Sequence, residues 1–126
     1  MCHQSVSLAA RDLEANGIAT VIIGSAMDIV TWCGVPRYLH NELPLGNPLG
    51  PPGDRAAQRD SIERALAMVE SMSEPGTEVS DLRWPGDENW QPVYARVDGS
   101  NRQTLLKMGE ENRKRRAADK AAGLVR

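Results

Sequence analysis

The sequence predicts an α/β fold: a small three-layer, Rossmann-like half-domain with few parallel strands over residues 1–76, an extended arm over 77–98 and a C-terminal helix over 99–126. Three observations support this prediction. Helix-like and strand-like segments alternate along the first part of the chain. One strand-like segment is apolar throughout, as expected for a strand that is buried on both faces of a parallel sheet. The arm shows no sustained period, and a polar helical pattern follows it.

The first elements should follow the order helix, strand, helix, strand. A helix is expected over Ser5–Asn16, where an Asn-Gly pair ends the pattern. Its apolar face should carry Val6, Ala9, Ala10 and Leu13. Ile18–Gly24 is the apolar strand, and Ser25 can cap the helix that follows and closes before Pro36. Arg37–His40 is the candidate for the second strand.

A loop and a long helix come next. Residues 44–53 contain four prolines and three glycines, so no regular element can run through them. Asp54 is placed to cap a helix that ends at Glu74-Pro75-Gly76. The core stripe of this helix should consist of Ile62, Ala65, Leu66, Val69 and Met72.

The arm and the last helix should contact other surfaces. The arm holds Trp84, Trp90 and Tyr94 among prolines and acidic residues, which suggests an extended segment laid over another surface. Residues 100–103, Ser-Asn-Arg-Gln, read as a capping box that opens a solvated helix. That helix has few apolar residues, so we expect it either to fray or to dock on a partner.

Composition excludes several classes of function. The formal net charge of −2 leaves no basic field that would gather nucleic acid, and the basic run at 113–116 follows two glutamates at four-residue spacing, as on a solvated helix face. Nucleic acid is therefore a poor candidate partner. No run of about 20 apolar residues predicts a membrane span. Without a secretory signal pattern the expected location is cytoplasmic, and the two cysteines are expected to be reduced thiols.

Cys2 and His3 are the strongest candidates for chemistry. They stand where the first helix begins, and a helix N-terminus stabilises a thiolate through its unpaired N–H groups and its dipole. The imidazole can draw off the thiol proton as a base. Alternatively, Cys2 and His3, with Cys33 or His40, could hold a transition metal such as zinc, iron or copper. The plainest interpretation is a packed thiol beside a capping imidazole.

A substrate site is expected from two further segments. Ser25 follows the first strand, where α/β proteins usually meet their ligands. Gly46 and Asn47 lie in the proline-glycine loop, whose backbone N–H groups could bind a carboxylate or phosphate. The loop lacks the Gly-Lys-Ser/Thr ending of a phosphate-binding P-loop, and it could equally be a rigid connection.

An α/β unit normally presents its reactive residue at the carboxyl end of a strand, just before the next helix. Cys2 and His3 have the helix but no strand in front of them. We therefore expect a larger partner subunit to supply that strand, in a hetero-oligomer that acts on a small-molecule substrate.

Several segments resemble the carboxyl-terminal part of the glycine/sarcosine/betaine reductase component B family, which includes the D-proline reductase selenoprotein subunit. The resemblance begins with the Cys2-His3-Gln4-Ser5-Val6 motif and the helix that ends in residues 16–21. It continues through a proline-glycine loop and the start of the next helix, and it ends in a tail typical of members without selenocysteine. The matching residues after the first helix are Pro36-Arg37, 44–48, Gly50, 52–54, Gln58-Arg59, 83–85 and Trp90, so the resemblance covers most of 2–90.

The resemblance implies reductive chemistry by a selenol or thiol on a small amino-acid-like or amine substrate, within a multi-subunit complex. Family selenoproteins place selenocysteine just upstream of the Cys-His-Gln equivalent, a region this sequence does not contain, so that position cannot be carried over. Cys2 is either the remaining member of a reactive pair or the only nucleophile. Three functions stay open: a reductase subunit in which His3 tunes Cys2, a metal-binding subunit, and a non-catalytic subunit that stabilises a larger one.

Overall fold

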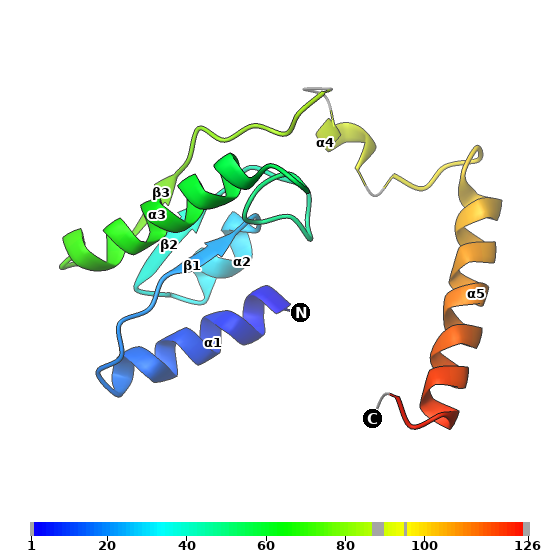
Figure 1. Ribbon diagram of the computed structural model, residues 1–126, viewed down its shortest axis with the longest axis horizontal. Coiled ribbons are helices and arrows are strands. Elements are labelled where there is room, and N and C mark those ends of the chain that lie inside the picture. The colour runs from blue at the N-terminus through cyan, green and yellow to red at the C-terminus, as the bar shows by residue number, and fades with distance from the viewer. Residues whose placement is uncertain (1, 87–89, 95, 125–126) are drawn as a thin grey trace. The chain divides into compact units, whose positions relative to one another are not determined.

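The computed structural model describes residues 2–86, 90–94 and 96–124 (Figure 1). The chain divides into two compact units, Met1–Gln91 and Pro92–Arg126. The first unit contains a three-stranded parallel sheet with its helices, and the second contains the C-terminal helix α5 (Arg102–Ala121). This arrangement agrees with the predicted α/β class.

The sheet has the strand order β1-β2-β3, and both pairs of neighbours are parallel. Its strands are β1 (Ile22–Gly24), β2 (Arg37–His40) and β3 (Gly76–Val79). The central strand β2 has the bounds that the sequence predicted. β1 is much shorter than the apolar run that predicted it, because residues 18–21 lead into the strand without pairing.

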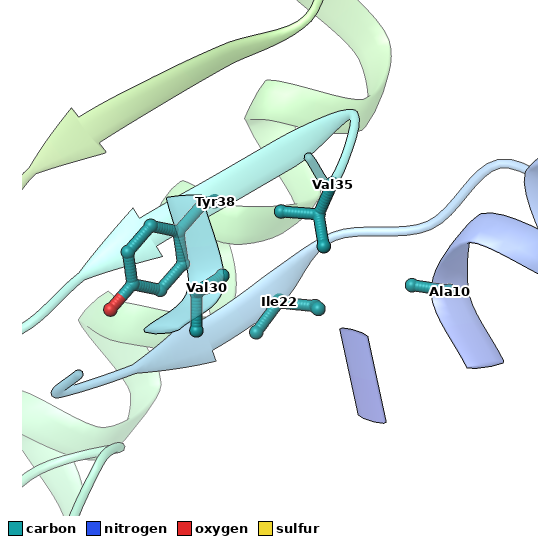
Figure 2. Packing of buried hydrophobic residues seen from close by; sticks show 5 residues of the cluster. All are labelled: Ala10, Ile22, Val30, Val35 and Tyr38. Carbon is teal, nitrogen blue, oxygen red and sulfur yellow. The ribbon is translucent and has the colours of Figure 1, made fainter. Parts of the chain in front are cut away.

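Helices cover both faces of this sheet, which gives three layers. One face packs against α1 (Cys2–Ala15) and α2 (Met27–Trp32), and Figure 2 shows the buried cluster there: Ala10, Ile22, Val30, Val35 and Tyr38. The other face packs against α3 (Arg55–Ser71) through Leu39, Ala65 and Met68. Neighbouring residues of a strand point to opposite faces, so Tyr38 and Leu39 belong to different clusters.

The two crossover connections have opposite hands. β2 is added beside β1 and β3 beside β2, in one direction across the sheet, yet α2 and α3 lie on opposite faces. Nearly all βαβ crossovers are right-handed, so one of these two departs from the rule. In a Rossmann half, successive right-handed crossovers put both helices on the same face, and this topology differs from it in that respect.

The predicted core face of α1 is only partly confirmed. The helix begins at Cys2, three residues before the predicted start, and Ala10 is buried as predicted. Val6, Ala9 and Leu13 are exposed, and Ser7 is buried instead. The rotation follows from Glu14, whose carboxylate accepts from the Arg37 guanidinium at 2.8 Å. Holding this ion pair turns the polar side of α1 toward the sheet.

The long helix α3 also buries a polar residue, Ser61, in place of a predicted apolar one. Asp54 caps it as predicted, because its Oδ1 accepts from the backbone N–H of Ala57 at 3.0 Å. Of the predicted core stripe, however, Ile62 is exposed and Leu66 is 59% exposed. Ala65 is buried as predicted and Met72 packs against the core, whereas Ser61 and Met68 are buried where the prediction had their neighbours Ile62 and Val69.

Two further predictions differ from the structure. Ser25 does not cap α2, whose N-cap position is Ala26 with no side-chain hydrogen bond. Strand β3 was not predicted, and it lies across the expected boundary between the 1–76 domain and the 77–98 arm. Three of its four residues are exposed, so it shows none of the apolar alternation that identifies a strand from sequence.

The last helix, α5, is polar. The arm includes the short helix α4 (Trp90–Val93), and α5 has no buried residue, in agreement with the predicted solvated helix. Within the described ranges, no helix has the length and apolar character needed to cross a membrane.

The buried side chain of Asn41 joins four segments at the carboxyl edge of the sheet. Its Nδ2 donates to the Pro48 carbonyl at 2.7 Å and to Ser61 Oγ at 3.0 Å, and its Oδ1 accepts from Ser80 Oγ at 2.6 Å. Its backbone N–H donates to the Gly24 carbonyl at 2.9 Å. One residue therefore connects β1, the proline-glycine loop, α3 and the end of β3.

Replacing Asn41 should destabilise the first unit. Asn41→Leu keeps the volume but leaves the hydroxyls of two buried serines and one carbonyl without this partner, and each such loss costs about 1–3 kcal/mol. We expect the free energy of unfolding in urea to fall by about 3 kcal/mol or more. The exposed Asn112→Leu is the control and should change it by about 0.5 kcal/mol or less. Equal effects of the two substitutions would contradict the role given to Asn41.

Candidate functional site

Four sequence-predicted site residues meet in one cavity at the carboxyl edge of the sheet. Cys2 and His3 enter it from the start of α1, Ser25 from the end of β1, and Gly46 from the proline-glycine loop. The cavity has a volume of about 270 Å³, and Val6, Ile23 and Pro48 complete its lining. This edge, where the carboxyl ends of parallel strands meet, is the usual ligand position in open α/β sheets.

Cys2 and His3 lie close enough to interact directly. The Cys2 Sγ is 3.8 Å from His3 Nδ1, and the Cys2 side chain is exposed. Both residues belong to the first turn of α1, where backbone N–H groups have no partner within the helix. The thiol therefore lies at the positive end of the helix dipole, with the imidazole of His3 as a polar neighbour.

Gly24 allows His3 and Tyr38 to approach the same point. A Cβ on Gly24 would lie 3.2 Å from Tyr38 Cε2 and 3.5 Å from His3 Cδ2, so the first of these contacts would be tight. Because Gly24 has no side chain, the rings of Tyr38 and His3 can both lie close to the end of β1.

Ser25 contributes an uncommitted hydroxyl. Among the residues that the structure describes, its Oγ is one of two buried side-chain polar atoms that lack a hydrogen-bond partner. A buried hydroxyl without a partner costs free energy, which a bound polar group would recover. Ser25 is therefore better interpreted as a wall of the cavity than as the helix cap that the sequence predicted.

A buried hydrogen bond beside this region was not predicted from the sequence. The Tyr38 hydroxyl is 2.9 Å from His40 Nδ1, and the half-exposed carboxylate of Glu42 has its Oε2 3.5 Å from His40 Nε2, within ion-pair distance. The Tyr38 hydroxyl accepts from the backbone N–H of Ala26, so its own proton is available to His40 Nδ1. The three residues alternate along one strand and its extension, and that spacing was the available signal.

Burial raises the pKa of Tyr38 to about 12. The negative charges of Asp28 and Glu42 raise it further, whereas a hydrogen bond from the backbone of Ala26 opposes them. Tyr38 therefore stays a neutral hydrogen-bond donor through the physiological range of pH.

The other candidate residues lie elsewhere. Asn47 lines a neighbouring cavity of about 280 Å³ with the rest of the proline-glycine loop, and Gly46 and Pro48 are common to both cavities. Cys33 lines a third cavity beside Trp32. His40 is engaged with Tyr38 and Glu42, so neither Cys33 nor His40 joins Cys2 and His3.

No group of three or more histidine, cysteine, aspartate or glutamate side chains in the described part of the chain is arranged to hold a metal ion. A structural zinc site needs four protein ligands. Among the described residues, Cys2 and His3 could supply two of them at most.

Comparisons with models of protein families, with curated proteins and with solved structures found no match to this chain.

The raised pKa of Tyr38 predicts a specific loss of stability at alkaline pH. The unfolded tyrosine releases its proton near pH 10 and the folded one near pH 12, so between these values the unfolded state binds fewer protons and the free energy of unfolding falls as pH rises. The full shift corresponds to about 3 kcal/mol. Tyr38→Phe should therefore flatten the dependence of urea stability on pH between 9 and 11.

The same substitution should lower stability at pH 7 by about 1–3 kcal/mol, because the backbone of Ala26 and the ring of His40 lose a partner. Tyr94→Phe, at an exposed position, is the control and should keep the wild-type dependence on pH. An unchanged alkaline slope in Tyr38→Phe would show that Tyr38 is not the group responsible.

Proposed function

We propose that this chain is the small, thiol-bearing subunit of a reductase complex that resembles glycine/sarcosine/betaine reductase component B and acts on a small amino-acid-like or amine substrate. The main support is the cavity that Cys2, His3, Ser25 and Gly46 line together. Three segments bring a nucleophile, a base, a free hydroxyl and a glycine backbone into one small cavity. Such chemistry requires this set of groups.

Each residue has a distinct role in this proposal. His3 accepts the proton of Cys2, and the start of α1 stabilises the resulting thiolate. The Ser25 hydroxyl donates to a polar atom of the substrate, and the backbone at Gly46 closes the other side of the cavity.

Reduction of a substrate C–N bond needs two electrons, and two thiols can supply them. The Cys2 thiolate attacks carbon and displaces the amine, which forms a C–S bond. A second thiolate then attacks the Cys2 sulfur, so that a disulfide forms and the released carbon takes a proton. Cys33 lines a different cavity, so in this proposal the partner subunit provides the second thiol or selenol.

The outer edge of β1 supports a partner that adds a strand. In the described residues no strand pairs with this edge, and α1 exposes Val6 and Leu13 beside the equally exposed Ile18. A strand that precedes α1 in a βαβ unit would take this edge and be covered by that face of the helix. The carboxyl end of the partner's strand would then lie beside Cys2.

The reactivity of the two cysteines tests the thiol assignment. Purified together with the product of its neighbouring open reading frame, the chain should be alkylated by iodoacetamide at Cys2 at least about tenfold faster than at Cys33, because Cys2 is exposed at a helix N-terminus. His3→Gln should slow this reaction about tenfold at pH 7 by removing the base.

Activity of the complex gives the decisive comparison. Cys2→Ser should abolish reduction, whereas Cys33→Ser, the matched control, should retain it. Activity that survives Cys2→Ser but is lost when the part of the arm beyond β3, residues 81–98, is deleted would instead identify a non-catalytic stabilising subunit. Stoichiometric metal that protects Cys2 from alkylation would identify a metal centre.

The strand-addition proposal has its own test. Leu13→Glu should leave the free energy of unfolding of the isolated chain within about 1 kcal/mol of wild type, because the side chain is exposed, but should weaken complex formation at least about tenfold. Ile62→Glu, an equally exposed position on α3, is the control. Equal binding of the two variants in sedimentation experiments would argue against a partner at this face.

A further inference from the structure

The proline-glycine loop lines a second cavity beside the one that contains Cys2. This second cavity has a volume of about 280 Å³, and Gly46 and Pro48 belong to the lining of both cavities. Pockets that hold small molecules usually begin at about 300 Å³. Each cavity alone falls just below that size, whereas the two taken together lie well within the usual range.

Gly46 leaves the border between the two cavities open. Its backbone has a φ of +99°, and in the described part of the chain a Cβ at this position would have no atom beyond its two chain neighbours within 4 Å. Any other residue type would place a side chain in this open space. Glycine therefore leaves room for a ligand to extend from the side of Cys2 to the side of Asn47.

The side-chain amide of Asn47 is available to such a ligand. Asn47 is half-buried in the lining of the second cavity, and within the described ranges its side chain makes no hydrogen bond. An asparagine side chain offers two N–H donors and one carbonyl acceptor. These groups can pair with a polar group that enters the cavity.

Gln58 contributes a second amide in a fixed orientation. Its Nε2 donates to the Pro51 carbonyl at 2.8 Å, which directs the side chain. Gly50 permits this arrangement, because a Cβ on Gly50 would lie only 3.3 Å from Gln58 Cγ. Among the described residues the Oε1 atom of Gln58 has no donor, so it remains an acceptor for a ligand.

The rest of the lining determines which kind of group fits. Apart from the two amides it consists of proline, leucine and glycine residues, with no charged side chain among the described residues. A charged group would lose part of its hydration there without an opposite charge to pair with. An amide carries an N–H donor and a C=O acceptor, which match Asn47 and Gln58, and its flanking carbons match Leu49 and the prolines.

We infer that the two cavities form one elongated site, in which the cavity of Asn47 and Gln58 holds an uncharged amide group on the tail of the substrate. The inference rests on the proposed function, because it takes Cys2 as the residue that meets the reacting end. The substrate is then an amino-acid-like or amine group joined to a short amide-bearing chain, as in a small peptide.

Probes that alkylate Cys2 measure the tail site without the natural substrate. Chloroacetamides form a C–S bond to the thiol sulfur as chloride leaves. One set carries chains of one to four methylenes that end in an N-methylamide, a matching set ends in a carboxylate, and N-butylchloroacetamide has neither group. In the full chain, followed by mass spectrometry, one amide probe should show saturable alkylation of Cys2. Relative to chloroacetamide itself, it should react at least about tenfold faster than the butyl and carboxylate probes.

Substitutions at Asn47 assign the tail to this cavity. Asn47→Leu should reduce the advantage of the preferred amide probe over chloroacetamide about tenfold, because an apolar side chain of similar volume cannot pair with the amide. Asn47→Lys should make a carboxylate probe the fastest of the tailed probes, a gain that loss of structure would not produce. Asn112→Leu is the matched control and should keep the wild-type ratios.

Two results would overturn the inference. One is an amide set that reacts at Cys2 no faster, relative to chloroacetamide, than the butyl and carboxylate probes, which would confine the ligand to the cavity of Cys2. The other is an unchanged preference in both Asn47 variants, which would place the tail elsewhere. Each comparison is a ratio of rates at one sulfur atom, so its result does not depend on whether Cys2→Ser abolishes reduction. The two proposals can therefore fail separately.

Discussion

The carboxyl edge of the sheet depends on the satisfied amide of Asn41. The proline-glycine loop has no helix or strand hydrogen bonds to hold it, so its position follows from a few contacts, of which the one between Asn41 and the Pro48 carbonyl is central. The same residue is flanked by His40, whose ring lies on the hydroxyl of Tyr38, and by Glu42, whose carboxylate accepts from Gln91. A buried polar group in a low-dielectric interior must find all its partners, and this requirement gives the edge a single arrangement.

Polar contacts also decide how the helices lie on the sheet. Glu14 on α1 and Ser61 on α3 have partners in the sheet or its loops, and each helix turns toward its polar residue at the expense of apolar neighbours. A buried donor or acceptor without a partner costs about 1–3 kcal/mol, comparable with the gain from burying one more aliphatic side chain. The apolar residues left outside, such as Leu13 and Leu66, then form surfaces available to other molecules.

The parts of the fold that local signals specify were predictable. The Asp54 cap and the irregular loop were expected from a capping carboxylate and dense proline, and strand β2 lies at the residues where the sequence placed it. The convergence of Cys2, His3, Ser25 and Gly46 followed from the rule that parallel strands present their carboxyl ends together.

What depends on distant partners was not predictable. The rotation of α1 is set by Arg37, 23 residues further on, and β3 is specified by pairing rather than by its own composition. The contacts of His40 with Tyr38 and Glu42 could be predicted only by knowing that this strand buries its polar face. Asn47, next to Gly46, turns into a neighbouring cavity, a difference of one residue that loop composition does not resolve.

The two outer edges of the sheet differ in a way that bears on how the protein is made in the cell. β3 exposes Thr77 and Glu78, and a charged residue on an edge strand discourages pairing with other chains. β1 has only Ile22, Ile23 and Gly24 and no charge of its own. During synthesis, an uncharged edge of this kind is a place where two newly made copies would pair, so a strand added to β1 would also protect the chain from aggregation.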